Sequence, residues 1–549
     1  MTDLVGPLAV RQPLGEEHES PHVIGPLLVL AGLSAVVRLA CFPFDIEMID
    51  AAARVALAIR WLHHPSVMSA NDCSQFGPLP VYLNAGILSI WNAPYTAPRF
   101  LSLIFGSATV VPLFFLTRLL FGRRAAIFSG VFFAFYTLQV KSSITAMAEA
   151  PFGFLFLAGL FYLFRFRRDG TTRDLYIAAV WISLACLVRY EGWLYVPLFG
   201  LLSVRPSARS GGGAGWLMDS LKSAVGFVMI ASLCPILWMT MNYVKGADPL
   251  WAWHFIAKDH AQLAEMALVK RGGIGGVIYN LFFSPGVLLL SLTPAVAILS
   301  LAGFLRALRR KQTLAYVVLF VPSLVYVVET LGMRMAPLAR LFTLTGLLLL
   351  PYAGAQMAVW TAGLSRSAMV RRATGVILSA VIVFLALLSA AFLPGLPLHQ
   401  KCWSVSPVSP FLPEEKEVFD LLKERMKPGD QLVQDGNTAY THTITFNISP
   451  NIYENWWARP TIDEGLKTPE DRIRYLESST PGFAVFETAK TDLPKLLNVP
   501  AERMSDFSKI TIRQIYSSPR YTVYELAPKM DRHRRFRQQD SAGEGQIPG

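Results

Sequence analysis

Long apolar runs recur through the first 394 residues of this 549-residue chain, and they constrain its fold more than any other feature. Each run is judged against the roughly 20 residues that an α-helix needs to cross a bilayer. We count about eleven runs, at roughly 23–43, 98–121, 125–141, 149–165, 174–189, 191–204, 217–242, 276–304, 313–329, 341–361 and 373–394. Only 16% of all residues are charged, against about a quarter in soluble domains. The sequence therefore predicts a polytopic α-helical membrane protein with about eleven transmembrane helices.

Short basic clusters occur at every second connection between these runs. They read RLLFGRR, RFRRDGTTR, RPSAR, RALRRK and RSAMVRR, in a chain whose formal net charge is +12. Short cytoplasmic loops of membrane proteins are enriched in Lys and Arg. The positive charge is therefore attributed to the orientation of the chain in the membrane, and no nucleic-acid partner is predicted. The N-terminus is predicted to be cytoplasmic and the C-terminus extracytoplasmic. The short loops favour a bacterial plasma (inner) membrane.

The composition changes after residue 395, where charged helical and β-rich segments alternate. A charged helix is expected within 414–430, further helices at 469–479 and 491–499, strands at 431–435 and 482–488, and a strand pair within 509–526. Such alternation is typical of a small α/β domain. The predicted organisation is a cytoplasmic tail at 1–22, a transmembrane domain at 23–394 with a long external loop at 44–97, an extracytoplasmic α/β domain at 395–528, and a disordered tail at 529–549.

Three carboxylates follow the first apolar run directly, in the stretch FPFDIEMID. They are Asp45, Glu47 and Asp50. Carboxylates beside hydrocarbon are costly unless water or a cation meets them. A carboxylate at the membrane surface can accept a proton from an attacking hydroxyl group. The amphipathic stretch MIDAAARVALAIRWLHH, which follows, is expected to lie in the interface, where a lipid headgroup could rest.

Further ionisable residues fall at the predicted external ends of the spans. They are Arg99, Lys141, Glu149, Arg189, Glu191, Arg334 and Arg340. Each alone is explained almost as well by a side chain that anchors a helix at the interface. Together they indicate a shared site, because cations can hold a phosphate group and stabilise it as it leaves. Transfer of a sugar from a lipid phosphate requires both the carboxylate and the cations.

Several motifs carry a resemblance to a known family. Arg99 opens a span that ends in the turn Phe121-Gly122-Arg123-Arg124, and Glu149 opens a later span. The stretch QFGPLPVYLNAG precedes the first of these spans, and VRYEGWL occupies 188–194. In this order the motifs resemble those of the membrane-embedded C-type glycosyltransferases. They are most similar to the family 39-like branch of protein O-mannosyltransferases and lipid A aminoarabinose transferases.

The resemblance implies an inverting glycosyltransferase that moves a hexosyl or pentosyl group from a polyprenyl-phosphate donor to an acceptor hydroxyl on the outer face. Its first external loop carries an acidic base, often written Asp-Glu. This chain has Asp45-Ile46-Glu47, and we take Asp45 as the first candidate and Glu47 as the second. The predicted donor-phosphate ligands are Arg99, Lys141, Arg189, Arg334 and Arg340. The predicted supporting residues are Glu149, Glu191, Asp259 and His260, of which the last two resemble a Glu-His pair in some relatives.

The implied partners are the polyprenyl-phosphate sugar donor, an acceptor glycan, lipid or protein, and the bilayer itself. No cofactor is required, and a divalent metal at Asp45 and Glu47 is left open. A lipid-linked glycan ligase or polymerase, and a membrane transporter or flippase, are the alternatives. A transporter would gather polar groups near the bilayer midplane in repeated halves, whereas this chain shows no repeat and places them at one surface.

Overall fold

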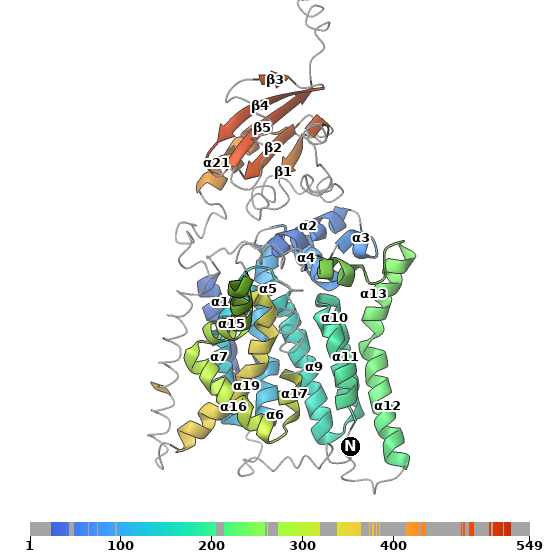
Figure 1. Ribbon diagram of the computed structural model, residues 1–549, viewed down its shortest axis with the longest axis vertical. Helices are drawn as coiled ribbons and strands as arrows, with labels where there is room; N and C mark the ends of the chain where they lie inside the picture. Colours follow the sequence, from blue (N-terminus) through green and yellow to red (C-terminus); the bar gives the residue numbers. More distant parts are fainter. Residues whose placement is uncertain are drawn as a thin grey trace, which may run out of the picture. The chain divides into compact units, whose positions relative to one another are not determined.

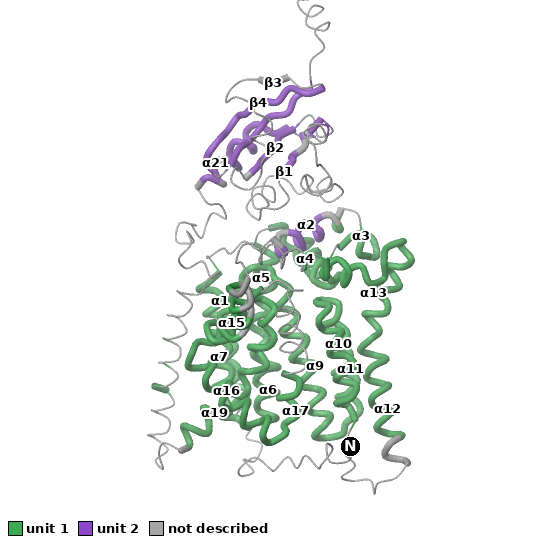
Figure 2. The backbone as a smooth tube through the Cα atoms, in the orientation of Figure 1, with its two compact units in different colours: residues 1–46, 61–403 green, residues 47–60, 404–549 purple. Residues whose placement is uncertain are grey.

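The computed structural model describes most of the apolar region and parts of the C-terminal region. The described residues are 23–42, 49–63, 65–73, 75–93, 96–204, 214–258, 273–318, 338–363, 413–427, 430–434, 482–487, 504–506, 509–519 and 521–528, with single positions at 261, 373, 376, 377, 380, 384, 474, 476 and 477. The chain divides into two compact units (Figure 2). The first holds residues 1–46 and 61–403, and the second holds residues 47–60 and 404–549.

The first unit is a bundle of helices. Its described helices are α1 (Ile24–Cys41), α3 (Ala70–Cys73), α4 (Pro78–Ile90), α5 (Ala97–Ala108), α6 (Val110–Phe121), α7 (Arg123–Ala134), α8 (Thr137–Ile144), α9 (Glu149–Asp169), α10 (Thr172–Val188), α11 (Glu191–Leu202), α12 (Ala214–Ala231), α13 (Leu233–Val244), α15 (Gly273–Ser291), α16 (Pro294–Arg309), α17 (Thr313–Val318), the 3₁₀ turn η3 (Ala339–Phe342) and α19 (Thr343–Gly363). Within the described residues, four helices are long and apolar enough to cross a membrane, or seven if each bent pair counts as one span. The prediction of a polytopic helical membrane protein agrees with this bundle.

Three predicted spans are broken in the structure, and the run at 217–242 is one of them, because it forms α12 and α13, whose axes differ by 42°. The run at 125–141 forms α7 and α8, whose axes differ by 56°, because Phe135 and Tyr136 leave the helical conformation between them. The run at 276–304 breaks before Pro294, where α16 begins. Proline lacks an N–H group and disfavours the helical conformation of the preceding residue, so the break before Pro294 has a local cause. The break between α7 and α8 has no proline or glycine at its site.

Close backbone approach holds the bundle together. Lipid tails are as apolar as the helix surfaces, so small residues and tight packing replace hydrophobic burial as the force between such helices. A Cβ atom on Gly354 of α19 would lie 2.3 Å from the carbonyl oxygen of Ala125 on α7, and one on Gly303 of α16 would lie 2.4 Å from that of Tyr352. Figure 1 shows the long helices of this unit side by side, with α6 and α9 packed together and α12–α13 at one flank.

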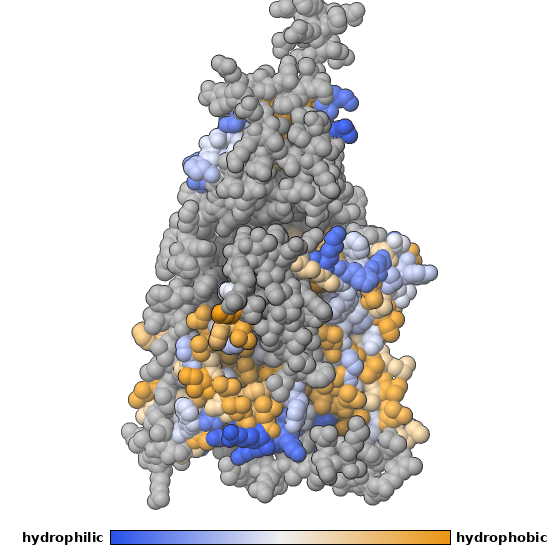
Figure 3. Space-filling model, viewed as in Figure 1, coloured by the Kyte–Doolittle hydropathy of each residue, from blue (hydrophilic) through white to orange (hydrophobic). Residues whose placement is uncertain are grey.

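The outer surface of the bundle is apolar along its side. Exposed apolar residues include Met229, Leu233, Ile236 and Leu237 on α12 and α13, and apolar side chains gather over the flank of the bundle in Figure 3. The cations of the predicted basic loop at 306–311 are exposed where α16 ends. An apolar flank with charged groups at the helix ends is the surface that a bilayer requires.

The second unit contains a five-stranded sheet. Its strands are β1 (Gln431–Gln434), β2 (Gly482–Glu487), β3 (Met504–Asp506), β4 (Ile510–Ser517) and β5 (Tyr521–Pro528), in the order β1-β2-β5-β4-β3. β1 and β2 are parallel, and the other pairs are antiparallel. Val418 and Leu422 of α21 (Pro413–Arg425) pack against one face of the sheet, and a second cluster that includes Phe486 and Ile512 covers the other.

The strands at 431–434 and 482–487 and the hairpin at 510–528 lie where the sequence predicts them, and α21 lies within the predicted helix at 414–430 except for its first residue. The short strand β3 was not predicted from the sequence. The predicted helix at 491–499 and most of the helix at 469–479 lie outside the described residues. The helix α2 (Ile49–His63) matches the predicted amphipathic stretch, and its residues 49–60 are assigned to this unit.

Candidate functional site

Glu149, Arg189 and Glu191 form a chain of ion pairs. Arg189 follows the last residue of α10, whereas Glu149 and Glu191 are the first residues of α9 and α11. One Arg189 amino group donates to Glu149, and its Nε donates to Oε1 of Glu191 at 2.7 Å. All three side chains are largely buried, that of Glu149 with only 3% exposed. The helix dipoles support this order, because acidic groups are favoured at helix N-termini and basic groups at C-termini.

Lys141 and Arg340 belong to the same cluster. Lys141 lies in the last turn of α8, where its charge is attracted by Glu149 and repelled by Arg340. Arg340 lies in η3, which is held against the start of α8 because the Tyr136 hydroxyl donates to the carbonyl oxygens of Phe342, at 3.3 Å, and Thr343, at 3.1 Å. Three predicted cations thus meet two predicted carboxylates, with one positive charge in excess.

Arg99 lies at a neighbouring junction. Its Nε donates to the carbonyl oxygen of Ile144, the last residue of α8, at 2.7 Å. Its Nη2 donates to that of Phe42 at 2.6 Å, and the guanidinium lies over the Phe42 ring. Arg99 therefore ties the end of α1 to the end of the helix that carries Lys141. Phe42 is only three residues before Asp45 along the chain.

The remaining predicted site residues lie outside the described residues. They are Asp45, Glu47, Arg334, Asp259 and His260. Their roles stay predictions. Within the described part of the chain no three His, Cys, Asp or Glu side chains are grouped as metal ligands would be.

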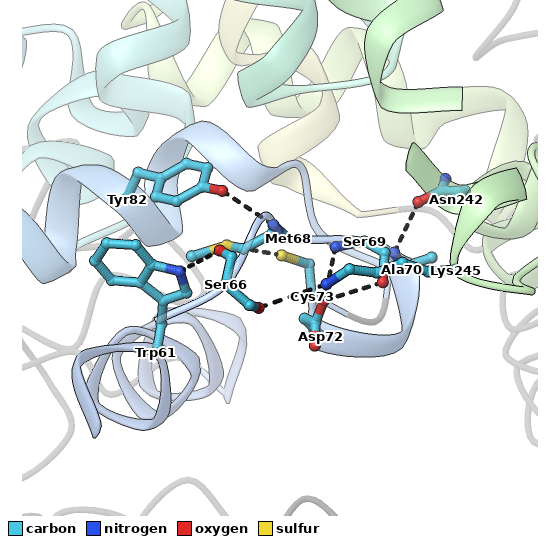
Figure 4. A network of polar contacts seen from close by, with 10 residues as sticks. All are labelled: Trp61, Ser66, Met68, Ser69, Ala70, Asp72, Cys73, Tyr82, Asn242 and Lys245. Carbon is cyan, nitrogen blue, oxygen red and sulfur yellow. Dashed lines mark hydrogen bonds and ion pairs between the residues drawn. The ribbon is translucent and has the colours of Figure 1, made fainter. Parts of the chain in front are cut away.

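A polar network that no sequence motif indicates holds the described residues of the segment 61–76 in place (Figure 4). Asp72 accepts hydrogen bonds from the Ser69 N–H at 2.8 Å and from Nζ of Lys245 at 3.1 Å. The Ala70 N–H donates to Oδ1 of Asn242 at 2.8 Å. Burial opposes ionisation of Asp72, but these donors outweigh it and hold the pKa of the carboxyl group below its usual value. This segment is thereby fastened to the end of α13.

The same segment also contacts the corner that carries Arg189. The buried hydroxyl of Tyr190 donates to the carbonyl oxygen of Phe76 at 3.2 Å and accepts a hydrogen bond from the Trp238 indole at 3.1 Å. Tyr190 stands inside the VRYEGWL motif, so the motif supplies both the ion-pairing arginine and the residue that docks the 61–76 segment. None of these tyrosine, tryptophan and asparagine contacts has a spacing signal in the sequence.

Arg38, which is fully buried in α1, was also not predicted as a site residue. The sequence does mark it, because Arg38 is the single charged residue of an otherwise apolar helix. Charged side chains inside membrane helices are costly and usually functional.

Comparisons with known proteins bear on this arrangement. Residues 75–239 match the family model described as dolichyl-phosphate-mannose-protein mannosyltransferase. The structure resembles that of ArnT from Cupriavidus metallidurans bound to undecaprenyl phosphate, with a TM-score of 0.60, 13% identity, and coverage of 91% of this chain and 98% of that one. The chain has the fold of the membrane-embedded C-type glycosyltransferases. The resemblance stated from the sequence motifs is thereby confirmed.

A second solved structure of similar fold is AglB, the oligosaccharyltransferase from Archaeoglobus fulgidus, in complex with an inhibitory peptide and a dolichol-phosphate. It matches with a TM-score of 0.52 and 14% identity, over 84% of this chain and 69% of that one. An Archaeoglobus fulgidus oligosaccharyltransferase tethered to an acceptor peptide matches with a TM-score of 0.54 and 13% identity, over 92% of this chain and 74% of that one. A comparison with curated protein sequences finds no match.

Proposed function

We propose that this chain is an inverting glycosyltransferase that moves a sugar from a polyprenyl-phosphate donor to an acceptor hydroxyl group. The observation that carries the proposal is the cation cluster in which Arg189 and Lys141 interact with buried Glu149 and Arg340 lies near Lys141. It occurs in a fold shared with ArnT and AglB, whose structures hold a polyprenyl phosphate or a dolichol-phosphate.

The cluster suits a phosphate group that leaves with the lipid. Glu149 and Glu191 hold Arg189 in one orientation, so its guanidinium is positioned before the donor binds. Preorganised cations stabilise developing negative charge without rearranging during the reaction. The excess positive charge of the cluster matches the charge that appears on the phosphate as the glycosidic bond breaks.

Asp45 is the first candidate for the base and Glu47 the second. In the proposed step the acceptor oxygen bonds to the anomeric carbon while the bond from that carbon to the phosphate oxygen breaks. The acceptor proton passes to the carboxylate, and the lipid phosphate departs with the bonding electrons. A single displacement of this kind inverts the anomeric configuration. Arg99 supports the placement, because it fastens Phe42, just before these acids, to the end of α8.

We place the site at the outer surface of a plasma (inner) membrane, with the N-terminus cytoplasmic and the sheet domain extracytoplasmic. Helix α9 supports this orientation, because it begins at Glu149 and has Arg167 and Arg168 in its last turn. Its 21 residues correspond to about 30 Å of helix, which is the thickness of a bilayer core. The basic end fits the cytoplasmic side, so the cluster falls on the opposite side.

The test is a transfer assay with the full-length protein in proteoliposomes and a radiolabelled polyprenyl-phosphate mannose. The proposal requires label to appear in the acceptor fraction of added membranes, together with free polyprenyl phosphate. Uptake of the labelled lipid into sealed vesicles without release of polyprenyl phosphate would instead identify a flippase. Donors with other sugars, tested in parallel, define the transferred group.

A further inference from the structure

Arg38 is the most deeply buried charge of the described residues, and neither the cluster nor the proposed reaction uses it. Its side chain is fully buried in α1, one of the four helices that could span a bilayer. Nη1 donates to the carbonyl oxygen and the hydroxyl of Ser34, at 3.1 and 2.7 Å, one turn earlier in the same helix. Nε donates to the Ser143 hydroxyl at 3.1 Å, and the guanidinium lies 4.8 Å from the centre of the Phe133 ring.

This arrangement is costly for a structural contact alone. A charge in the bilayer interior is tolerated where it is paired or hydrogen-bonded. Within the described residues no carboxylate pairs with Arg38, and Nη2 has no hydrogen-bond partner. The hydrogen bond to Ser143 is the one that reaches another helix. It joins α1 to α8, two residues beyond Lys141.

Helix α8 depends on such contacts for its orientation. It has only eight residues, and an isolated helix shorter than roughly 12 residues is at best marginally stable. Tyr136 fixes its start, and Arg99 holds the carbonyl oxygen of its last residue. Arg38 holds Ser143, whose hydroxyl in turn donates to the carbonyl oxygen of Gln139. Lys141 lies between Gln139 and Ser143 along the helix.

We infer that Arg38 is a positioning residue for the transfer reaction, acting through Ser143 to fix where α8 presents Lys141 to the donor phosphate. The inference rests on the proposed function and extends it to a residue within the bilayer-spanning part of α1. Arg38 does not touch the donor in this scheme. Its effect on the reaction passes through α8.

Gly106 of α5 lies against the contact between Arg38 and Ser143 and allows an independent test of it. A Cβ atom there would lie 1.9 Å from the Ser143 hydroxyl oxygen and 3.2 Å from Nε of Arg38. A methyl group at this position would push the two partners apart. Gly32 of α1 is the matched control, because nothing lies within 4 Å of a Cβ atom built there.

The experiment compares Ser143→Ala with Ser34→Ala in the full-length protein. Both variants delete one hydroxyl that contacts the same guanidinium, but only the first breaks the link to α8. We expect Ser143→Ala and Gly106→Ala to lower kcat/KM for the donor about tenfold, since small misplacement of a positioned group costs rate steeply. Ser34→Ala and Gly32→Ala should remain within about twofold of wild type on the same reasoning.

A double-mutant cycle separates positioning from general stability. The affinity for undecaprenyl phosphate is measured for Ser143→Ala, Lys141→Gln and the double variant. If Arg38 acts through Lys141, the loss caused by Ser143→Ala disappears in the Lys141→Gln background. Equal effects of Ser143→Ala and Ser34→Ala, or an unchanged loss in that background, would overturn the inference while leaving the proposed function intact. A wild-type protein that neither binds the lipid phosphate nor transfers sugar would overturn both.

Discussion

At the scale of single residues, the site is defined by how its charges are paired. Arg189 holds two carboxylates that stand at the N-termini of different helices, and Lys141 and Arg340 complete the cluster. The sequence predicts these residues as a set, because ionisable groups at helix ends are visible in the amino-acid pattern. The link from Glu149 through Arg189 to Glu191 depends on how α9, α10 and α11 meet, so it is seen only in the structure.

Removing the arginine at the centre of the cluster should destabilise the protein. In Arg189→Ala the Glu149 carboxylate, 3% exposed, loses its paired cation, and breaking a buried pair typically costs about 3–5 kcal/mol. The thermal unfolding midpoint in detergent should fall clearly. Adding Glu149→Gln to this variant should recover part of the loss. Arg168→Ala, which removes an exposed pair with Asp169, serves as the control and should leave the midpoint nearly unchanged.

The proposed base can be tested beside a matched carboxylate. Asp45→Asn should lower the rate of transfer by roughly 10²- to 10⁴-fold, the usual contribution of a positioned base, with the affinity for undecaprenyl phosphate retained. Asp50→Asn is the control, because Asp50 pairs with Arg54 at 3.9 Å within α2. If Asp45→Asn keeps wild-type turnover and Glu47→Gln loses it, the base is Glu47. Full turnover in both variants would refute the assignment.

At the scale of elements, the break between α7 and α8 decides where the cluster forms. The apolar pattern at 125–141 predicts one straight span, since nothing in it interrupts a helix. The structure bends it at Phe135 and Tyr136, and the Tyr136 hydroxyl donates to the carbonyl oxygens of Phe342, the last residue of η3, and Thr343, the first of α19. These long-range bonds bring η3, and with it Arg340, against α8.

Loss of the Tyr136 hydroxyl should therefore disturb both stability and donor use. Tyr136→Phe is expected to lower the free energy of unfolding by about 1 kcal/mol and to raise the donor KM, because η3 loses its anchor. Tyr352→Phe is the control: this tyrosine is equally buried, but its hydroxyl has no hydrogen-bond partner among the described residues. The control should be neutral or slightly stabilising. An identical donor KM in wild type and Tyr136→Phe would disprove the anchoring role.

At the scale of the whole molecule, segments far apart in the sequence are fastened around the site. Asp72 and Lys245 are 173 positions apart, and their ion pair joins the 61–76 segment to the end of α13. The two side chains are about one-third exposed, so solvent screening keeps the contribution of this pair small. The ion pair mainly positions the 61–76 segment, in which Phe76 accepts a hydrogen bond from Tyr190, the neighbour of Arg189.

The Asp72 contact should make stability depend on pH in the acidic range. Because its pKa in the folded protein lies below the unfolded value, which is about 3.9, its contribution is complete above that pH and is lost as the pH falls through the folded pKa. Asp72→Asn should thus lower the free energy of unfolding by about 1 kcal/mol or less at pH 7. The difference from wild type should shrink below pH 4. Asp219→Asn, in an exposed pair with Lys222, should show no such trend.

The sequence by itself determined the class of protein, the residues at the helix ends and most strands of the C-terminal sheet. These follow from local rules: span length from bilayer thickness, and strands from short apolar runs. Only the tertiary structure showed the bend before α8, the ion pairs through Arg189 and the link from Arg38 to Ser143. Those depend on how separate helices pack together, with Arg189 and Glu149 40 positions apart and Arg38 and Ser143 105 positions apart, and no local pattern encodes which partners will meet.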